Sequence, residues 1–136
     1  MLQPKEPYKF NPKNPYGYEL ILDLHECDTT KFNQKDLTTF FEKVCEVTDM
    51  ELAEIHFWDD LETPEDEKQT EAHTIGTSAV CFILTSSIVV HTLDVLKRVY
   101  INVFTCKPFN ATVAEEFIIK WFNCKDLKKS TFIKRY

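Results

Sequence analysis

Two serines, a histidine and a cysteine are the residues of this chain whose types and spacing could do chemistry. Ser78 and Ser86 precede His91 and Cys106, and polar Thr-Ser-Ser residues interrupt the apolar runs around Ser86. A hydroxyl can act as a nucleophile, and an imidazole exchanges protons near neutral pH. A thiol can serve as nucleophile, acid or base. We therefore treat these four side chains as one candidate catalytic set.

The pattern of apolar residues predicts the elements that position this set. Alternating apolar residues predict strands at 17–26, 51–58, 78–84, 86–92, 98–105 and, as a short terminal strand, 130–133. Apolar spacings of three and four predict helices at 34–48 and 111–122, the second burying Val113, Phe117, Ile118, Trp121 and Phe122. This order favours an α+β fold, a two-layer α/β sandwich with a mostly antiparallel sheet and two helices on one face. The four candidate residues then lie on consecutive strands.

The domain organisation is simple. Residues 1–16 hold four of the six prolines and predict an irregular N-terminal arm, followed by a single domain over 17–136. Residues 59–72 are strongly acidic at first, then polar, and contain Pro64, so we expect a solvated loop there.

Composition excludes several classes of function. The formal net charge of −6 disfavours nucleic acid as a partner. The chain has only two glycines, which excludes a glycine-rich phosphate loop. Five cysteines without a C-x-x-C pair argue against a disulfide framework and against a metal site. Without a long apolar run or a leader-like start, we expect no membrane association and a cytoplasmic location.

Four short elements follow one another along the chain, namely Gly-(eight residues)-Glu26-Cys27-Asp28, Gly76-Thr77-Ser78-Ala79, Thr85-Ser86-Ser87-Ile88-Val89-Val90-His91-Thr92 and Val103-Phe104-Thr105-Cys106. By the order and spacing of these elements, the region from Gly17 to about Phe122 resembles the prokaryotic S-adenosylmethionine decarboxylases, which are pyruvoyl-dependent enzymes of polyamine (spermidine) biosynthesis.

The resemblance implies a proenzyme that cleaves itself between Thr85 and Ser86. Ser86 would form an ester and then become the pyruvoyl group, the cofactor that makes a Schiff base with the substrate amine. Ser78 and His91 would match the processing residues, and Cys106 would match the proton donor in decarboxylation. The resemblance also implies a small-molecule substrate, S-adenosylmethionine, and a homodimer.

The chain departs from the family pattern at positions that concern the substrate. Thr85 and Ser87 replace the Glu and His on either side of the cleaved serine, and Val95 replaces the Glu that binds ribose hydroxyls. Arginine or ornithine is therefore an alternative substrate, whose distal cation Asp94 and Glu26 could meet.

The sequence leaves open which residue contacts the adenine ring and which class of function applies. Phe57 or Trp58 is a candidate for stacking on the adenine ring, because the family has an aromatic residue there. The rival hypotheses are a homologue that does not process and acts as a binding or regulatory protein, and an unrelated α+β binding module.

Overall fold

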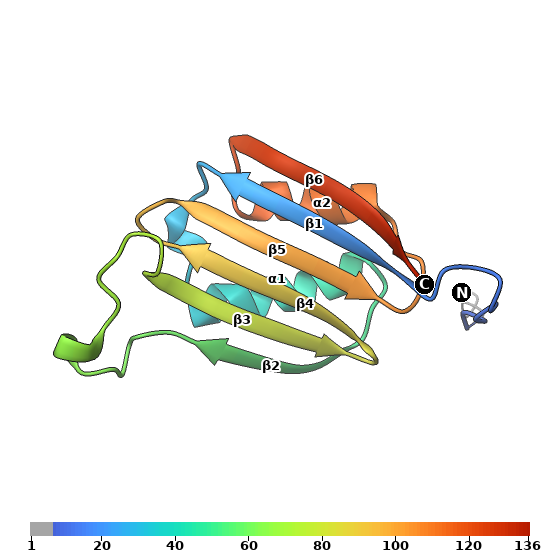
Figure 1. The fold of residues 1–136 in the computed structure, drawn as a ribbon, viewed down its shortest axis with the longest axis horizontal. Helices are drawn as coiled ribbons and strands as arrows, with labels where there is room; N and C mark the ends of the chain where they lie inside the picture. Colours follow the sequence, from blue (N-terminus) through green and yellow to red (C-terminus); the bar gives the residue numbers. More distant parts are fainter. Residues whose placement is uncertain (1–6) are drawn as a thin grey trace, which may run out of the picture.

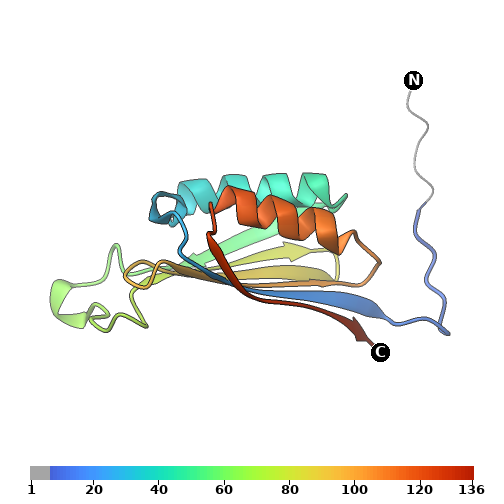
Figure 2. The ribbon, with the colours of Figure 1, turned by 90° about the horizontal axis from the view of Figure 1, so that it is seen from above.

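Residues 7–136 are described by a computed structural model, and they form a sheet covered on one face by two helices (Figures 1 and 2). The strands are β1 (Gly17–His25), β2 (Leu52–Trp58), β3 (Gly76–Ile83), β4 (Ser86–Leu93), β5 (Arg98–Thr105) and β6 (Asp126–Arg135). The helices are α1 (Gln34–Val47) and α2 (Ala111–Trp121). Neighbouring strands are antiparallel in the order β2-β3-β4-β5-β1-β6. The predicted α+β sandwich is confirmed.

Both helices begin at asparagine caps and bury one apolar stripe. The Asn33 side chain accepts the Asp36 N–H, and the Asn110 side chain accepts the Val113 N–H, which satisfies a backbone donor at each helix start. Leu37, Phe40, Phe41, Val44 and Cys45 of α1 are buried, as are Ala114 and Ile118 of α2. The prediction that Val113 is buried was wrong: Val113 is 37% exposed, because the first turn of α2 presents Ala114 to the core instead.

The two faces of the sheet have different surroundings. Alternate residues of the inner strands, such as Leu22, Ile88 and Ile101, point into the core beneath the helices. The residues between them form what we call the open face, on which no element within residues 7–136 packs (Figure 2). Because no helix covers the open face, side chains of β3 and β4 reach solvent there.

The last strand is longer than the sequence pattern suggested. β6 pairs with β1 along Gly17–His25 and covers Asp126–Arg135, where we predicted a strand only at 130–133. Half of the ten residues of β6 are charged, and charged side chains are typical of edge strands because they hinder pairing with other molecules. The alternation of apolar residues is lost for that reason.

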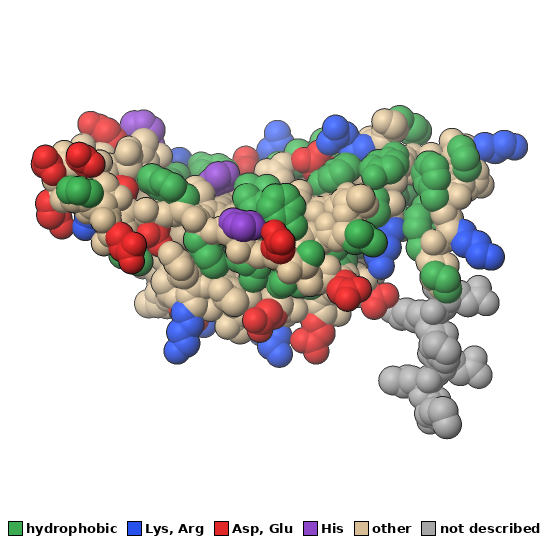
Figure 3. Space-filling model, turned by 90° about the horizontal axis from the view of Figure 1, so that it is seen from below, with side chains coloured by type: hydrophobic (Ala, Val, Ile, Leu, Met, Phe, Trp, Pro, Cys, Tyr) green, Lys and Arg blue, Asp and Glu red, His purple; other side chains and the backbone are tan. Residues whose placement is uncertain are grey.

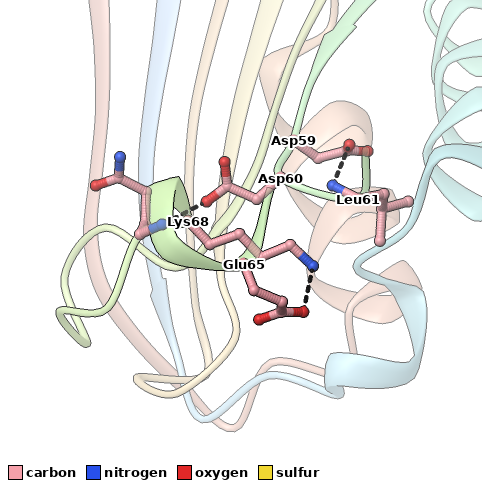
Figure 4. A network of polar contacts seen from close by, with 6 residues as sticks. Asp59, Asp60, Leu61, Glu65 and Lys68 are labelled. Carbon is pink, nitrogen blue, oxygen red and sulfur yellow. Dashed lines mark hydrogen bonds and ion pairs between the residues drawn. The ribbon is translucent and has the colours of Figure 1, made fainter. Parts of the chain in front are cut away.

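The loop between β2 and β3, residues 59–75, extends beyond the predicted loop and is organised by its own carboxylates (Figure 4). Asp60 Oδ2 accepts the Gln69 N–H at 2.7 Å, and Asp59 Oδ1 accepts the Leu61 N–H at 3.1 Å. Lys68 Nζ lies 3.0 Å from Glu65 Oε1. Acidic side chains gather at this end of the molecule (Figure 3).

The N-terminal segment leaves from the opposite end (Figure 1). Tyr16 stacks on Phe104 at 6.4 Å between ring centroids, and Phe10 meets Tyr16 edge-on. The first part of the predicted arm, residues 1–6, lies outside the described residues. Across residues 7–136, no helix is long and apolar enough to cross a membrane.

Candidate functional site

The turn between β3 and β4 fixes which candidate residues meet. Leu84 and Thr85 form a two-residue turn between Ile83 and Ser86, so each residue of β3 has a defined partner on β4. This register sets Ser78 directly opposite His91 on the open face. Ser78 Oγ lies 2.8 Å from His91 Nδ1, which is hydrogen-bonding distance. The structure therefore brings two of the four candidates together as a hydroxyl–imidazole pair.

Aromatic residues flank this pair on both neighbouring strands. Trp58 of β2 is opposite Ser78, and Tyr100 of β5 is opposite His91. All four side chains line a cleft of about 410 Å³, whose remaining wall includes Gln69, His73 and Thr74 from the loop before β3. An exposed imidazole, a hydroxyl and two aromatic rings thus share one concave surface.

Ser86 and Cys106 meet at the other end of β4. The Cys106 backbone N–H donates to Ser86 Oγ at 3.0 Å, and Ser86 is buried on the helix-covered side of the sheet. The Thr85 hydroxyl lies 3.2 Å from Cys106 Sγ, and Cys106 Sγ lies 3.7 Å from the Leu84 carbonyl oxygen. A pocket of about 190 Å³ opens beside them, lined also by Met50, Glu51 and Lys107. The residues on both sides of the Thr85–Ser86 peptide bond therefore contact one cysteine.

Thr85 has an unusual backbone conformation. Its φ is +50°, in the left-handed region that glycine or asparagine normally occupies in tight turns. For a β-branched residue this conformation costs on the order of 1–3 kcal/mol. The peptide bond after Thr85 follows a strained residue.

Contacts around Cys106 act on its thiol in opposite directions. Burial works to raise the thiol pKa, but hydrogen bonds from Thr85 and Ser86, the Cys106 backbone amide and the Lys107 charge together lower it. The net pKa is below the ordinary cysteine value, so the thiolate is more accessible than in an unperturbed cysteine.

The two pairs are well separated within one chain. Ser86 and His91 are five residues apart on the same strand, which is roughly 17 Å at about 3.4 Å per residue. Ser86 also faces the helices, whereas His91 faces the open side. The four predicted catalytic residues therefore form two half-sites, Ser86–Cys106 and Ser78–His91.

The predicted substrate-binding residues lie in different places. Trp58 lines the cleft beside Ser78 and is 50% exposed, whereas Phe57 faces the helices and packs against the core. Asp94 lines a pocket on the helix side, where burial raises its pKa. Glu26 lines another pocket with Lys97 and Lys125. Neither acid lines the cleft that holds His91.

The cleft also contains residues that sequence reasoning missed. Tyr100 could have been found from the strand register, since it is opposite His91. Gln69 and His73 carry no periodic signal, because they belong to an irregular loop. Within residues 7–136, no group of three or more His, Cys, Asp or Glu side chains is arranged to hold a metal ion.

Comparisons with known proteins show a family and a similar fold. The family model for S-adenosylmethionine decarboxylase matches residues 18–135. The crystal structure of the adenosylmethionine decarboxylase from Aquifex aeolicus VF5 is similar in fold, with a TM-score of 0.72, 19% identity, and coverage of 90% of this chain and 92% of that one. A search of curated protein sequences gives no significant match.

Proposed function

This chain belongs to the S-adenosylmethionine decarboxylase family, and we propose that it decarboxylates S-adenosylmethionine with a pyruvoyl group made from its own Ser86. When formed, such a group supplies an electron-withdrawing carbonyl to which the substrate amine can attach. The observation that carries the proposal is the turn at Thr85–Ser86, where strain, a buried hydroxyl and a thiol of lowered pKa coincide.

The residues around this turn fit the making of such a group. Ser86 Oγ is held by the Cys106 N–H beside the peptide bond it must attack. Attack on the Thr85 carbonyl would convert the peptide bond into an ester, and opening the turn would release the left-handed strain at Thr85. Elimination of the ester then needs a base for the Ser86 α-proton, and His91, oriented by Ser78, is our candidate.

A second copy of the chain would complete the site. Because His91 lies roughly 17 Å from Ser86 within one chain, the imidazole that acts on Ser86 would come from a partner molecule. The open face is the surface that such a partner would cover. It carries apolar side chains from several strands, namely Trp58, Val80, Phe82, Val89, Leu93, Tyr100 and Phe104. A sheet with one uncovered apolar face favours a two-fold homodimer.

For the substrate, the cleft favours a ligand with an aromatic group. Trp58 and Tyr100 offer ring faces beside Ser78 and His91, which suits an adenine ring. Val95, at the position where the family has an acid, is 58% exposed and does not line this cleft. Arginine and ornithine remain the alternative substrates to be tested, although Asp94 and Glu26 line other pockets.

The test has two stages. Intact mass of purified protein is expected to show two chains, 1–85 and 86–136, in place of one. Carbon dioxide release is then measured with S-adenosylmethionine, arginine and ornithine in parallel. A chain that stays full length after long incubation would leave a binding or regulatory homologue as the better description, and release from arginine alone would reassign the substrate.

A further inference from the structure

Cys106 is the titratable residue that touches both sides of the bond to be cleaved. Its backbone N–H donates to Ser86 Oγ at 3.0 Å, and its sulfur lies 3.2 Å from the Thr85 hydroxyl. The Ser86 hydroxyl is also one of the groups that lower the pKa of the Cys106 thiol. His91 of the same chain lies on the other face of the sheet, and its Nδ1 is engaged with Ser78. Cys106 is therefore the titratable residue beside the first step, the attack of Ser86 on Thr85, whereas His91 is the candidate for the later elimination.

We propose that Cys106 is the base that activates Ser86 for the acyl shift, a catalytic role before the pyruvoyl group exists. This inference rests on the proposed function, because it concerns how the chain would process itself. It separates two proton transfers, with Cys106 acting before the ester forms and His91 acting after it.

The step balances without any added reactant. The Cys106 thiolate takes the proton from Ser86 Oγ as that oxygen bonds to the Thr85 carbonyl carbon. The Thr85 C–Ser86 N bond then breaks, and the new thiol returns its proton to the departing nitrogen. The product is an ester between Thr85 and the Ser86 side chain, with a free amine on Ser86 and the cysteine again a thiolate.

The surroundings of Cys106 support a usable thiolate. The charged groups that share its pocket are Lys107 and Glu51, and Lys107 Nζ also donates to the backbone oxygen of Asp49 at 2.9 Å. Lys107 favours the thiolate, and hydroxyl donors at Thr85 and Ser86 stabilise it further, so the thiol pKa falls despite burial. Thr85 therefore has a second role beside its strained backbone, because its hydroxyl lowers the pKa of the proposed base.

The decisive experiment isolates ester formation. In a His91→Ala background, elimination is blocked by hypothesis and the ester accumulates, so brief hydroxylamine treatment followed by intact mass measures the acyl shift alone. We expect Cys106→Ala and Cys106→Ser in this background to form ester about 10²–10⁴ times more slowly, the usual contribution of a positioned base. Both variants keep the backbone N–H that holds Ser86 Oγ.

Two controls separate base catalysis from a structural effect. Cys124→Ala removes another half-buried thiol, one that contacts the His25 carbonyl oxygen, and is expected to leave ester formation unchanged. The rate in the His91→Ala parent should rise with pH through the thiol pKa, because only the thiolate can accept the proton. Thr85→Val removes a hydroxyl that lowers this pKa and should move the whole profile to higher pH.

The outcomes discriminate clearly. Ester formation in Cys106→Ala at the parent rate and with the parent pH profile overturns the inference, while cleavage of the wild type leaves the proposed function standing. A wild type that forms neither ester nor fragments counts against both. If Cys106→Ala does not fold, Cys106→Ser and the shift in Thr85→Val give the same decision.

Discussion

The two ends of the β3–β4 hairpin differ in backbone and in exposure. At one end buried Ser86 meets partly exposed Cys106 beside a strained turn, and at the other end Ser78 and His91 lie on the open face beside two aromatic rings. Each end also abuts one of the two glycines of the chain. A Cβ at Gly17 would overlap the Thr105 carbonyl oxygen, and a Cβ at Gly76 would overlap that of Thr92.

This difference supports the proposal that the two ends of the hairpin serve different steps. In the proposed function, the end with Ser86 and Cys106 supplies the nucleophile, the strained turn and a thiol of lowered pKa for breaking the backbone bond. The exposed end holds an imidazole that is hydrogen-bonded to Ser78, on a concave surface with two aromatic rings. The predictions below test whether the two residue pairs serve different steps, beginning with the largest expected effect.

Ser86→Ala should abolish cleavage completely, because no hydroxyl remains to attack the Thr85 carbonyl. Ser87→Ala is the matched control, since Ser87 is the next residue but faces the open side, opposite Phe104. Intact mass after purification reads both variants. Fragments from Ser86→Ala, or a full-length Ser87→Ala chain, would place the nucleophile elsewhere.

His91→Ala should arrest the chain at the ester, visible as fragments that appear only after hydroxylamine. If the two half-sites act across a dimer, co-production with Ser86→Ala should rescue a tagged His91→Ala chain, because the mixed pair has one intact Ser86 and one intact His91 facing each other. Random pairing in equal amounts places about half of the tagged chains in such mixed pairs. Absence of rescue in isolated mixed dimers would mean that both residues act within one chain.

The two glycines allow each end to be disturbed separately. Gly17→Ala should push on Thr105 and slow ester formation, whereas Gly76→Ala should push on Thr92 and slow the step after the ester. Each substitution is expected to lower the free energy of unfolding by about 1–3 kcal/mol through overpacking. Denaturant unfolding gives the stability, and the fraction of hydroxylamine-sensitive chain gives the affected step. The same step slowed in both variants would contradict the division.

Trp58→Ala should have the smallest effect, weakening S-adenosylmethionine binding about twofold to twelvefold, as expected for loss of one aromatic pair worth about 0.5–1.5 kcal/mol. His56→Ala is the control, because His56 is an exposed residue on the same face of the same strand. Substrate titration of the processed protein, followed by calorimetry, measures both. Equal affinity in the two variants would remove Trp58 from the binding surface.

Sequence reasoning predicted the layers of the fold and proposed the four candidate residues, but it did not predict their division into pairs. The helices were predictable because Asn33 and Asn110 cap clear apolar stripes. The pairing of Ser78 with His91 follows from the two-residue turn at Leu84–Thr85. The sequence pattern predicted the break between these strands but not the left-handed conformation of Thr85, which glycine or asparagine would have signalled. The cleft walls Gln69 and His73 depend on the path of an irregular loop, which periodicity does not report.

The strand order has a mechanical consequence if the bond after Thr85 is cut. Residues 1–85 would hold β1, α1, β2 and β3, and residues 86–136 would hold β4, β5, α2 and β6, yet β1 lies between β5 and β6. Strands of the two fragments therefore alternate within one sheet, and dilution alone would not separate the fragments. Folding must precede cutting, since the halves interleave most readily while joined. Refolding of the cut and unfolded protein is bimolecular, because two fragments must meet. Recovery after heating should therefore depend on protein concentration for the cut form. It should not depend on concentration for the Ser86→Ala precursor, provided that both are measured as monomers.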